Sequence, residues 1–582
     1  MRRAMKTPRA LLGALASAAA VAALIVPGSA AAAVDPLGCT PTLQYDSSVP
    51  TFTQFATEHG YEYTTLGGFD TGTKDRHIAS QLYAYEEAIA RATENNPRVR
   101  VLIRNMGHTA EGRTFQYSVI GTPEHIAKLE SDAAFWRGVR GGEISTEEAL
   151  AKVRSANPPA AFGWITETPH GNEPAGGEAS MRMLYELAAR EDCANARRLQ
   201  TMDFFIDPAR NPDGRDNNTR TTAWSFDPNR DLMYQTQDVN REPLEDIFQY
   251  PSLFFIDAHQ QSTGYFFPPN EDPVHHEISH FSLDLIQDVI GPALQARFND
   301  QSLQYRNYND YDLFTPEYGD SVPSLILGGA GMTYEKGSSE NYGKQVYDHY
   351  LAMDETANVV SKEAKSLSEG WVEEWAEAKE QGAACEVQRN ELVSPLHETI
   401  SQQPEISICG YYFKPGLHSG DTAHILKLLQ NREVKVYRLT QPVTVSGAHD
   451  WGKNVSDKAT KTETLPAGTL YIPDSQTMKH WINATLEENP YIPYPYYYDV
   501  VDWAFSQLSD GPATGSCRRR CRRARRWKRS GPKDRASARS KASPTRCTPS
   551  PPTRPKRSAW SPNWSPEGRR CTAPARPSRP TG

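Results

Sequence analysis

Short apolar segments that alternate with helical segments most restrict the fold of this 582-residue chain. Runs of about four to eight mainly apolar residues are typical of buried strands, whereas apolar residues repeated every three or four positions are typical of helices. Helical segments lie between several of the predicted strands, as in residues 177–190, where Ala179, Met183 and Leu187 share one face. The strands are predicted at AAFGWITE, MDFFIDP, SLFFIDAH, SLILGG and GMTYEKG, which begin at residues 160, 202, 252, 324 and 331.

The segment before these strands has the same two patterns. Residues 76–92 and 124–139 have a helical period, and residues 98–107 and 113–122 are predicted to form the two strands of a hairpin. Strands that alternate with helices indicate an α/β sandwich around a largely parallel sheet. In such folds, ligands bind at the loops that follow the strands. Polar residues directly after predicted strands are therefore the candidates for a functional site.

The charge of the chain is unevenly distributed. The net charge is −8, but residues 517–582 contain 21 Lys and Arg against two acids, so this tail carries about +19 and the preceding residues about −27. The tail has no Leu, Ile, Val, Met, Phe or Tyr, and we expect it to be disordered because it cannot bury a core. The tail could anchor the protein to an anionic cell-surface polymer, or it could have no function. The interpretation we favour is a frame shift near Ser516, because the composition changes abruptly there.

The N-terminus predicts a signal peptide over residues 1–33. A basic start is followed by an apolar run from Ala10 to Val26 and by small residues up to Ala33. The apolar run is short for a membrane span, and no later stretch is long enough to be one, so we expect a secreted, soluble protein. Export permits disulfides, and an even set of cysteines outside the tail allows three pairings among Cys39, Cys193, Cys385 and Cys409.

Ligand-type residues gather after two of the predicted strands. His170 and Glu173 lie in a Gly- and Pro-rich loop after the first, and His259 ends another. Zinc binds imidazole nitrogen and carboxylate oxygen, and catalytic sites use three protein ligands with the fourth position open to water. A single histidine would more often be a loop residue bonded to backbone. Three such residues on strand-end loops favour a metal site.

Four motifs in order resemble those of the carboxypeptidase A-like zinc metallocarboxypeptidases. They are HGNE, NPDGRDNNTRTTAWSFDPNRD, DAHQQ and GMTYEKG, and the resemblance covers roughly Tyr61 to Ala378. It implies an α/β/α sandwich with a mixed, mostly parallel, twisted sheet of eight strands. It also implies one Zn²⁺ per chain and a peptide or protein substrate with a free C-terminal carboxylate.

The resemblance assigns a role to each matching residue. His170, Glu173 and His259 correspond to the zinc ligands. Arg220 corresponds to the arginine that stabilises the oxyanion, and Asn229 and Arg230 correspond to the pair that binds the substrate's terminal carboxylate. Glu335 corresponds to the catalytic glutamate, and Tyr318 to the tyrosine that covers the substrate. The side chains suit these tasks, because an arginine fork grips a carboxylate through two hydrogen bonds and a carboxylate near zinc can accept the proton of water.

Several positions keep alternatives at this stage. Arg215 lies in the same loop as Arg220, and Tyr308 and Tyr311 compete with Tyr318. A second pair, Asn240 and Arg241, competes with Asn229 and Arg230. The ordinary interpretation of Arg230 is a pair with Asp227 or Asp231 in a solvated loop. The ordinary interpretation of Glu335 is a surface salt bridge. The specificity position falls near Asp320, which would suit a basic C-terminal side chain.

The segment HHEISH, residues 275–280, contains a second metal-binding pattern. Its surroundings predict a helix capped by Asp272, on which His276 and His280 would lie one turn apart, as zinc peptidases of the HExxH type require. No third ligand follows at a suitable spacing. We therefore interpret the match as accidental, with Val274, Ile278, Phe281 and Leu285 facing the core and the histidines at the margin of the helix.

These patterns divide the chain into residues 1–33 as signal peptide, 34–378 as catalytic domain, 379–516 as a small α/β accessory domain and 517–582 as basic tail. The favoured function is a secreted zinc carboxypeptidase without a nucleic-acid partner. Association with the cell wall would also be consistent with the tail. The alternatives are a metallopeptidase that processes cell-wall peptides, and a catalytically silent protein that binds peptides or cell-wall material on the same fold.

Overall fold

The computed structural model describes residues 39–61, 76–232, 234–260, 264–268, 274–307, 324, 326–338, 340–388, 407–416, 419–450, 459–488, 513–515 and 527–529. The predicted signal peptide, most of the basic tail, Tyr308, Tyr311, Tyr318 and Asp320 lie outside these residues. The chain divides into two compact units, residues 1–530 and residues 531–582, and the second unit lies outside the described residues.

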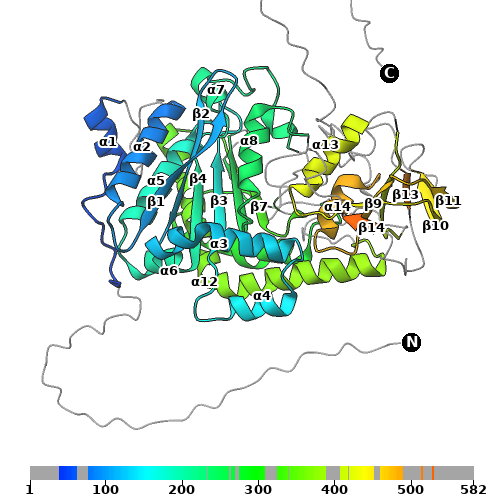
Figure 1. Ribbon diagram of the computed structural model, residues 1–582. Helices are drawn as coiled ribbons and strands as arrows, with labels where there is room; N and C mark the ends of the chain where they lie inside the picture. The colour runs from blue at the N-terminus through cyan, green and yellow to red at the C-terminus, as the bar shows by residue number, and fades with distance from the viewer. Residues whose placement is uncertain are drawn as a thin grey trace, which may run out of the picture. The chain divides into compact units, whose positions relative to one another are not determined.

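A seven-stranded mixed sheet forms the centre of the first unit (Figure 1). Its strands in chain order are β1 (Arg100–His108), β2 (Thr114–Gly121), β3 (Ala161–Glu167), β4 (Met202–Asp207), β5 (Phe254–His259), β6 (Tyr265–Phe266) and β7 (Ala330–Lys336). The spatial order is β1-β2-β4-β3-β5-β7-β6. β4, β3, β5 and β7 run parallel, whereas β1, β2 and β6 pair antiparallel at the two sides.

The mixed sheet confirms the predicted α/β class, and β1 with β2 is the predicted hairpin. The parallel part is limited to the four central strands. The resemblance implies eight strands, and the described residues form seven of them in this sheet. The predicted strand at residues 324–329 is wrong, because Ser324 and Ile326 are helical and a turn follows them. A short apolar run does not distinguish a strand from a buried helical turn.

Helices cover both faces of this sheet. Neighbouring residues of β2 show this, because side chains alternate between the two faces of a strand. Gln116 donates to the backbone of Tyr83 and to Glu86 on α2 (Ala79–Ala92). Tyr117 instead bonds Asp246 of α8 (Asp238–Ile247). The sandwich is therefore α/β/α, as predicted.

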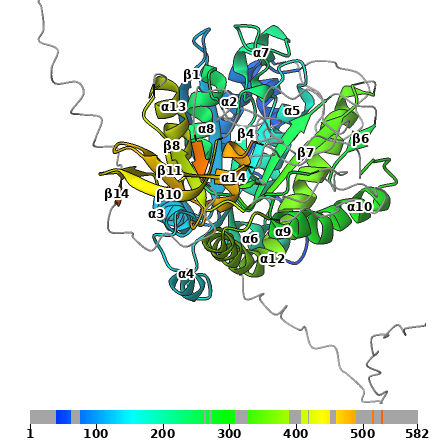
Figure 2. The same cartoon turned by 90° about the vertical axis from the view of Figure 1, so that its right-hand side faces the viewer.

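The α2 face is completed by α5 (Ala175–Ala189), which contacts β2, β3 and β4 and packs against α2 and the long α12 (Tyr342–Ala384) (Figure 2). Nearly every residue of α5 is buried, which its small side chains allow. Further helices of this unit are α1 (Phe52–His59), α3 (Pro123–Arg140), α4 (Thr146–Val153), α6 (Cys193–Thr201), α7 (Pro212–Asn217), α9 (His280–Asp284) and α10 (Gly291–Asp300), with a 3₁₀ turn at Pro228–Arg230 and a π-helical stretch at Leu285–Ile290. Among the described residues, no helix has the length and apolar character that crossing a membrane requires.

A second sheet follows α12. Its strands are β8 (Gly410–Phe413), β9 (Tyr437–Leu439), β10 (Val443–Asp450), β11 (Lys461–Leu465), β12 (Leu470–Pro473), β13 (Ala513–Gly515) and β14 (Trp527–Arg529), with helices α13 (Ser419–Gln430) and α14 (Lys479–Leu486). Their order is β11-β10-β13-β8-β12-β9-β14, and every pairing is antiparallel. The predicted α/β content of this region is thus present. The predicted boundary after residue 378 falls inside α12, and the domain division stays a prediction.

β14 differs from the prediction for the basic tail. Residues 527–529 pair antiparallel with β9, although residues 517–582 were expected to be disordered throughout. The expectation rested on the lack of core-forming side chains. A strand at the edge of a sheet needs only backbone hydrogen bonds to its neighbour, which almost any composition can supply.

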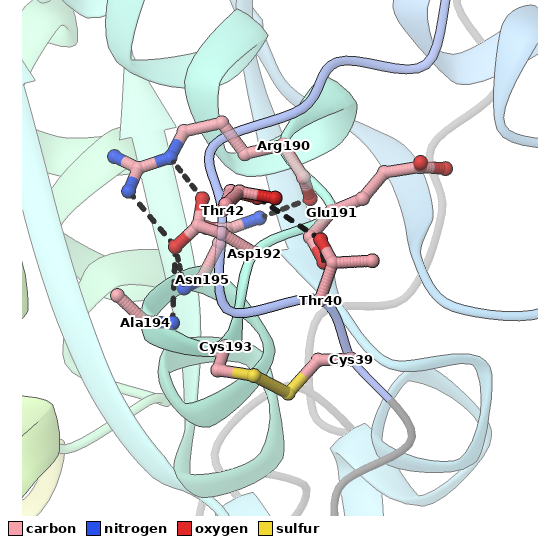
Figure 3. Close-up of a disulfide and its surroundings, with 9 residues drawn as sticks. All are labelled: Cys39, Thr40, Thr42, Arg190, Glu191, Asp192, Cys193, Ala194 and Asn195. Carbon is pink, nitrogen blue, oxygen red and sulfur yellow. Dashed lines mark hydrogen bonds and ion pairs between the residues drawn. A yellow bond between two sulfur atoms is a disulfide. The ribbon is translucent and has the colours of Figure 1, made fainter. Parts of the chain in front are cut away.

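Two disulfides select one of the three predicted pairings, Cys39–Cys193 and Cys385–Cys409. Figure 3 shows the first, which ties the beginning of the described chain to the start of α6. Asp192 caps this helix by accepting from the backbone N–H groups of Ala194 and Asn195, at 3.0 and 3.3 Å. The Cys193 amide also donates to the Thr40 carbonyl at 2.9 Å, so the two segments are joined by backbone as well as by sulfur.

Candidate metal centre

The centre is built where β3 and β5 end. These strands are adjacent and parallel, so their carboxyl ends meet at the same edge of the sheet. His259 is the last residue of β5, and the loop after β3 carries His170 and Glu173. Thr168 begins this loop with a φ of 60°, a backbone conformation that is rare for a β-branched residue. Such strain is maintained only where the surrounding structure enforces it, which is common at functional sites.

Gly171 allows the loop to approach the next one. A Cβ at this position would collide with the backbone of Gly214 and Arg215. A glycine in the HGNE motif therefore permits close contact with the loop that carries NPDG. This contact brings the segment after β4 next to the three candidate ligands.

The donor atoms of the three residues converge on one point. The Nδ1 atoms of His170 and His259 are 3.2 Å apart, and each lies 2.9 Å from an oxygen of Glu173. All three side chains are almost fully buried. Two His nitrogens and one carboxylate, with their donor atoms within 4.8 Å of one another, form a set that could hold a metal ion.

The outer nitrogen of each histidine faces a carboxylate. His170 Nε2 is 2.9 Å from Asp227, and His259 Nε2 is 2.7 Å from Asp257. In a neutral imidazole that donates its Nε2 proton to such a partner, Nδ1 carries a lone pair. Two lone pairs and a carboxylate then face each other at close range, and a bound cation would relieve this repulsion. The residues therefore fit the zinc ion that the resemblance implies, and the outer carboxylates match the partners that metal-binding histidines usually have.

The charge of these carboxylates is favoured by their surroundings. Burial raises the pKa of Asp227, but the His170 ring and the guanidinium groups of Arg220 and Arg230 outweigh it and hold this pKa well below its usual range. Burial likewise opposes the charge of Glu173, and the two histidine rings, when they are protonated, outweigh it and lower the pKa of Glu173. Both groups are therefore carboxylates at neutral pH.

The two candidate arginines occupy different environments. Arg220 bonds Asp227 at 2.8 Å and Glu173 at 3.2 Å, and about a third of its side chain is exposed. Arg215 is fully buried and bonds Glu178 at 3.0 Å and the carbonyl of His77 at 2.8 Å. Arg220 is thus the arginine that borders the metal centre, and Arg215 holds helices together behind it.

The two Asn-Arg pairs also differ. Asn229 is buried, and its amide is 3.2 Å from His259 Nε2, while Arg230 follows it with its guanidinium bonded to the Asn229 carbonyl at 2.8 Å. Asn240 instead donates to the carbonyl of Pro228 at 2.7 Å. Arg241 is exposed and donates to the Thr236 carbonyl at 3.3 Å. The second pair therefore supports the segment of the first from outside and does not reach the histidines.

Glu335 lies beside His259. β5 and β7 are parallel, and His259 is in register with Glu335. Registered residues of adjacent strands point to the same face, so both side chains lie on one side of the sheet. The next residue, Lys336, bonds Asp348 of α12 at 2.6 Å and therefore points to the opposite face. Glu335 is buried, which does not agree with the ordinary interpretation of a surface salt bridge.

Sequence reasoning missed the two carboxylates that face the outer nitrogens. Asp227 was considered only as a partner of Arg230, and Asp257 was not considered. The signal for Asp257 is its position two residues before His259 on one strand, since alternate residues share a face. No comparable signal exists for Asp227, which is 57 residues from His170 in sequence. Tyr318, the candidate to cover the substrate, lies outside the described residues.

The prediction for HHEISH is wrong in its geometry. α9 begins at His280 with Ser279 as its N-cap, so His276 and His280 do not share a helix. The two preceding histidines are fully buried and not at a margin. His276 Nδ1 is 2.9 Å from the carbonyl of Gln388, and its Nε2 lies close to Glu487 after α14. A contact with a distant segment, not a local helix, determines where these rings lie.

His275, His276 and Glu487 form a second group with donor atoms close enough to hold a metal. The tautomer of His275 argues against it. The backbone N–H of Glu277 donates to His275 Nδ1 at 3.0 Å, so a neutral ring carries its proton on Nε2, the atom that faces Glu487 at 3.3 Å. A protonated nitrogen cannot bind a metal. The group is better explained as two N–H donors sharing one carboxylate, with His276 as an imidazolium, because its Nδ1 already donates to the Gln388 carbonyl.

Comparison with known proteins agrees with the first centre. Residues 85–322 match the family model described as zinc carboxypeptidase. Curated relatives include the probable carboxypeptidase 2 of Arthroderma benhamiae and the carboxypeptidase 2 of Trichophyton rubrum, each 34% identical over 119 residues. The aligned part is 20% of this chain and 22% of each relative, so the chain spans about a fifth of the length of the curated relatives it matches.

Solved structures with similar chains include a metallo-carboxypeptidase from Burkholderia cenocepacia, at 18% identity and a TM-score of 0.34 over 48% of this chain and 69% of that chain. The carboxypeptidase A of Helicoverpa armigera gives 14% identity and a TM-score of 0.37 over 54% of this chain and 78% of that chain. The assignment itself rests on the family match and on the motifs that it contains. The matched segment, which includes His170, Glu173 and His259, belongs to the zinc carboxypeptidase family.

Proposed function

We propose that this protein is a secreted zinc-dependent carboxypeptidase that hydrolyses the C-terminal peptide bond of peptides or proteins. The observation that carries the proposal is the convergence of two Nδ1 atoms and the Glu173 carboxylate at the end of two parallel strands. A catalytic zinc site keeps one position open, and three protein ligands satisfy that requirement. One zinc ion per chain is part of the proposal, because the tautomer of His275 disfavours the second group.

His170, Glu173 and His259 would hold the metal. When bound, zinc lowers the pKa of a water molecule and polarises a carbonyl group. Asp227 and Asp257 keep the two rings in the tautomer that directs Nδ1 towards the metal. These carboxylates also prevent the rings from turning, so the ligand set stays preformed.

Glu335 is proposed as general base and general acid. Its register with His259 supports a position beside the metal, and its burial keeps competing solvent away. A carboxylate placed in this way accepts the proton of the attacking water and then donates it to the leaving amine.

Arg220 and the Asn229-Arg230 pair are proposed to bind the substrate. Arg220 borders the metal ligands, so its guanidinium can stabilise the negative charge that develops on the carbonyl oxygen. Arg230 can hold the terminal carboxylate through two parallel hydrogen bonds, and Asn229 adds a neutral donor. Tyr318 remains the proposed cover of the bound substrate.

Secretion is proposed on the basis of the predicted signal peptide, and two disulfides support it. Structural disulfides persist in oxidising compartments and are rare in the cytosol. Cell-wall association through the basic tail stays a proposal without structural support among the described residues.

Release of C-terminal amino acids from a peptide panel tests the proposed activity. The free-acid peptides should be hydrolysed, their C-terminal amides should resist, and a zinc chelator should abolish the release in a way that added zinc reverses. Equal cleavage of acids and amides would contradict the role of Arg230, because an arginine that binds a carboxylate should require one. Binding of the peptides without any hydrolysis would favour the silent binding protein.

A further inference from the structure

Residues 222–226 form a turn beside the metal centre that presents two aromatic side chains to solvent. Trp224 is 66% exposed and Phe226 is 56% exposed. Arg220, whose guanidinium borders the metal ligands, precedes this aromatic turn. Asp227 follows Phe226 directly, and its carboxylate faces a ligand imidazole at 2.9 Å. Consecutive Cα atoms are about 3.8 Å apart, so the two aromatic residues lie at the rim of the centre.

The backbone of the aromatic turn is fixed by its own hydrogen bonds. The Thr222 N–H donates to the Phe226 carbonyl, and the Ser225 N–H donates to the Thr222 carbonyl, each at 2.9 Å. Ser225 has a φ of 64°, the left-handed conformation that commonly closes a three-residue hairpin loop. The hydroxyl of the buried Thr222 accepts from the N–H groups of Trp224 and Phe226, each at 3.3 Å. The turn is therefore preformed, and a ligand would not have to order it.

The two aromatic side chains do not contribute to the core. Within the described part of the chain, neither ring stacks on another ring, and the Trp224 indole N–H makes no hydrogen bond. Large apolar side chains left in water beside a functional site commonly mark the place where a partner binds. Tryptophan suits this task, because it offers a large rigid surface and loses little rotamer freedom on binding.

The path of the substrate indicates what binds to the aromatic turn. The proposed function places the terminal carboxylate at Arg230 and the scissile carbonyl at Arg220, so the peptide upstream of the scissile bond has to leave the centre towards solvent. Asn229 is buried, whereas Arg220 and Asp227 are partly exposed. The outgoing peptide therefore passes the exposed edge of the centre, and the aromatic turn continues this edge.

We propose that Trp224 and Phe226 form a subsite for an aromatic side chain of the peptide substrate on the N-terminal side of the scissile bond. Such a subsite rests on the proposed carboxypeptidase function and adds a preference for substrate sequence to it. A substrate ring can pack against the exposed rings in the edge-to-face or offset geometry that aromatic pairs prefer. A basic side chain is disfavoured at the same place, because the guanidinium of Arg220 lies beside the turn.

A phenylalanine scan of the substrate tests the subsite. The substrate is an acetylated polyalanine peptide that ends in the residue released fastest from the peptide panel, or in leucine if none is released. One phenylalanine then replaces each upstream alanine in turn. We expect kcat/KM of the parent protein to rise about threefold to tenfold for phenylalanine at one upstream position, because aromatic contacts contribute about this much.

Variants of the turn identify the residues responsible for this ratio. In Trp224→Ala the ratio of kcat/KM between the phenylalanine and alanine peptides should fall to about one, and Trp224→Phe should keep most of it. Phe226→Ala is the second variant if Trp224→Ala does not fold. Leu43→Ala is the matched control, because its side chain is 57% exposed and lies in the segment bonded to Glu191, and it should keep the parent ratio.

Affinity is measured apart from hydrolysis. Calorimetric titration of zinc-loaded Glu335→Gln gives the Kd of the same peptides, and the parent protein takes its place if it hydrolyses none of them. The phenylalanine peptide should bind about threefold to tenfold more tightly than the alanine peptide. Trp224→Ala in the same background should remove this difference. Absence of hydrolysis together with a retained difference in Kd would contradict the proposed function and leave the subsite in place.

Four results would overturn the subsite. They are a ratio near one at every upstream position, an unchanged ratio in Trp224→Ala, a preference for lysine over phenylalanine at the same position, and absence of peptide binding. Sedimentation analysis examines the other possible occupant, a second copy of the chain. A dimer of the parent protein that Trp224→Ala dissociates would show that the aromatic turn is an interface between copies, which would also overturn the proposal.

Discussion

Two groups of two histidines and one glutamate lie buried among the residues that the structure describes, and only one of the two is arranged to hold a metal. In both groups the potential ligand atoms lie within 4.8 Å of one another. The outer nitrogens of His170 and His259 face carboxylates, whereas the outer nitrogen of His275 accepts a backbone N–H. The two groups therefore share residue types and a close arrangement of ligand atoms, and the hydrogen bond on the far side of each ring decides between metal ligand and proton donor.

The surroundings of the two groups differ as well. Arg220 and Asp227 lie next to the first group and are partly exposed, so a substrate can reach the first group. The second group is enclosed by α12, α14 and the segment before α9. Its neighbour Glu277 is fully buried and bonds Lys479 at 2.8 Å and Asn483 at 2.9 Å. We infer that the first group performs chemistry and that the second joins the segment before α9 to the chain after α12 and after α14.

The strongest test of the comparison is the zinc content of two alanine variants. His170→Ala should lose the metal and all hydrolysis, because a three-ligand site cannot spare one ligand. His276→Ala should keep one zinc per chain. Elemental analysis of both proteins beside the parent provides the measurement, and loss of zinc only from His276→Ala would reverse the assignment of the two groups.

Glu335→Gln should lower turnover by about 100-fold to 10,000-fold, because it removes a general base but no ligand. The zinc content should not change. Steady-state hydrolysis of a good peptide measures the effect, and Glu380→Gln on the exposed end of α12 is the control. Turnover close to that of the parent would show that Glu335 is not the base.

Lys479→Met should destabilise the fold by about 3 to 5 kcal/mol, because it leaves Glu277 buried without its ammonium partner. Zinc content and activity per folded molecule should stay the same. Urea unfolding of the variant measures the free energy. Lys461→Met, at an exposed pair with Asp450, is the control and should change stability by less than about 1 kcal/mol. A loss of zinc from folded Lys479→Met would mean that the two groups are coupled.

Asp257→Asn should weaken zinc binding by about tenfold to 100-fold, because an amide holds the His259 ring less firmly in the required tautomer. Competition with a fluorescent chelator measures the affinity. Asp216→Asn is a suitable control, since this carboxylate bonds Arg113 and no histidine. An unchanged affinity for Asp257→Asn would remove the feature on which the comparison of the two groups depends.

The smallest expected effect is a pH dependence of stability from the second group. Burial lowers the pKa of His276, but the nearby Glu487 carboxylate outweighs it, so this pKa lies above the usual value. The folded state thus binds the proton more tightly than the unfolded chain. The contribution of protonated His276 to stability is complete below the unfolded pKa of about 6.5, and it is lost as the pH rises through the higher folded pKa.

The melting temperature of the parent protein should therefore fall more between pH 6.5 and 8.5 than that of His276→Gln. A metal at His276 would have the opposite sign, because ligand binding releases protons and strengthens with pH. A parent protein that gains stability over this range relative to the variant would contradict the proton-donor interpretation.

The sequence by itself determined the α/β class, the hairpin, and which residues after β3 and β5 could bind a metal. These features depend on local periodicity and on side-chain chemistry, which the sequence states directly. It did not identify the helical conformation of Ser324 and Ile326, because a short apolar run fits a strand or a buried turn equally well. For the same reason it extended a helix through His276, where the chain is held by Gln388 and Glu487 instead.

Only the tertiary structure decided the rest. Cys39 pairs with Cys193, and Asp227 contacts His170, although each pair is distant in sequence. The different environments of Arg215 and Arg220 likewise depend on contacts with distant segments. The same is true of the tautomers that distinguish the two histidine groups. A tautomer is determined by the hydrogen-bond partner of each ring nitrogen, and that partner is known only after the chain has folded.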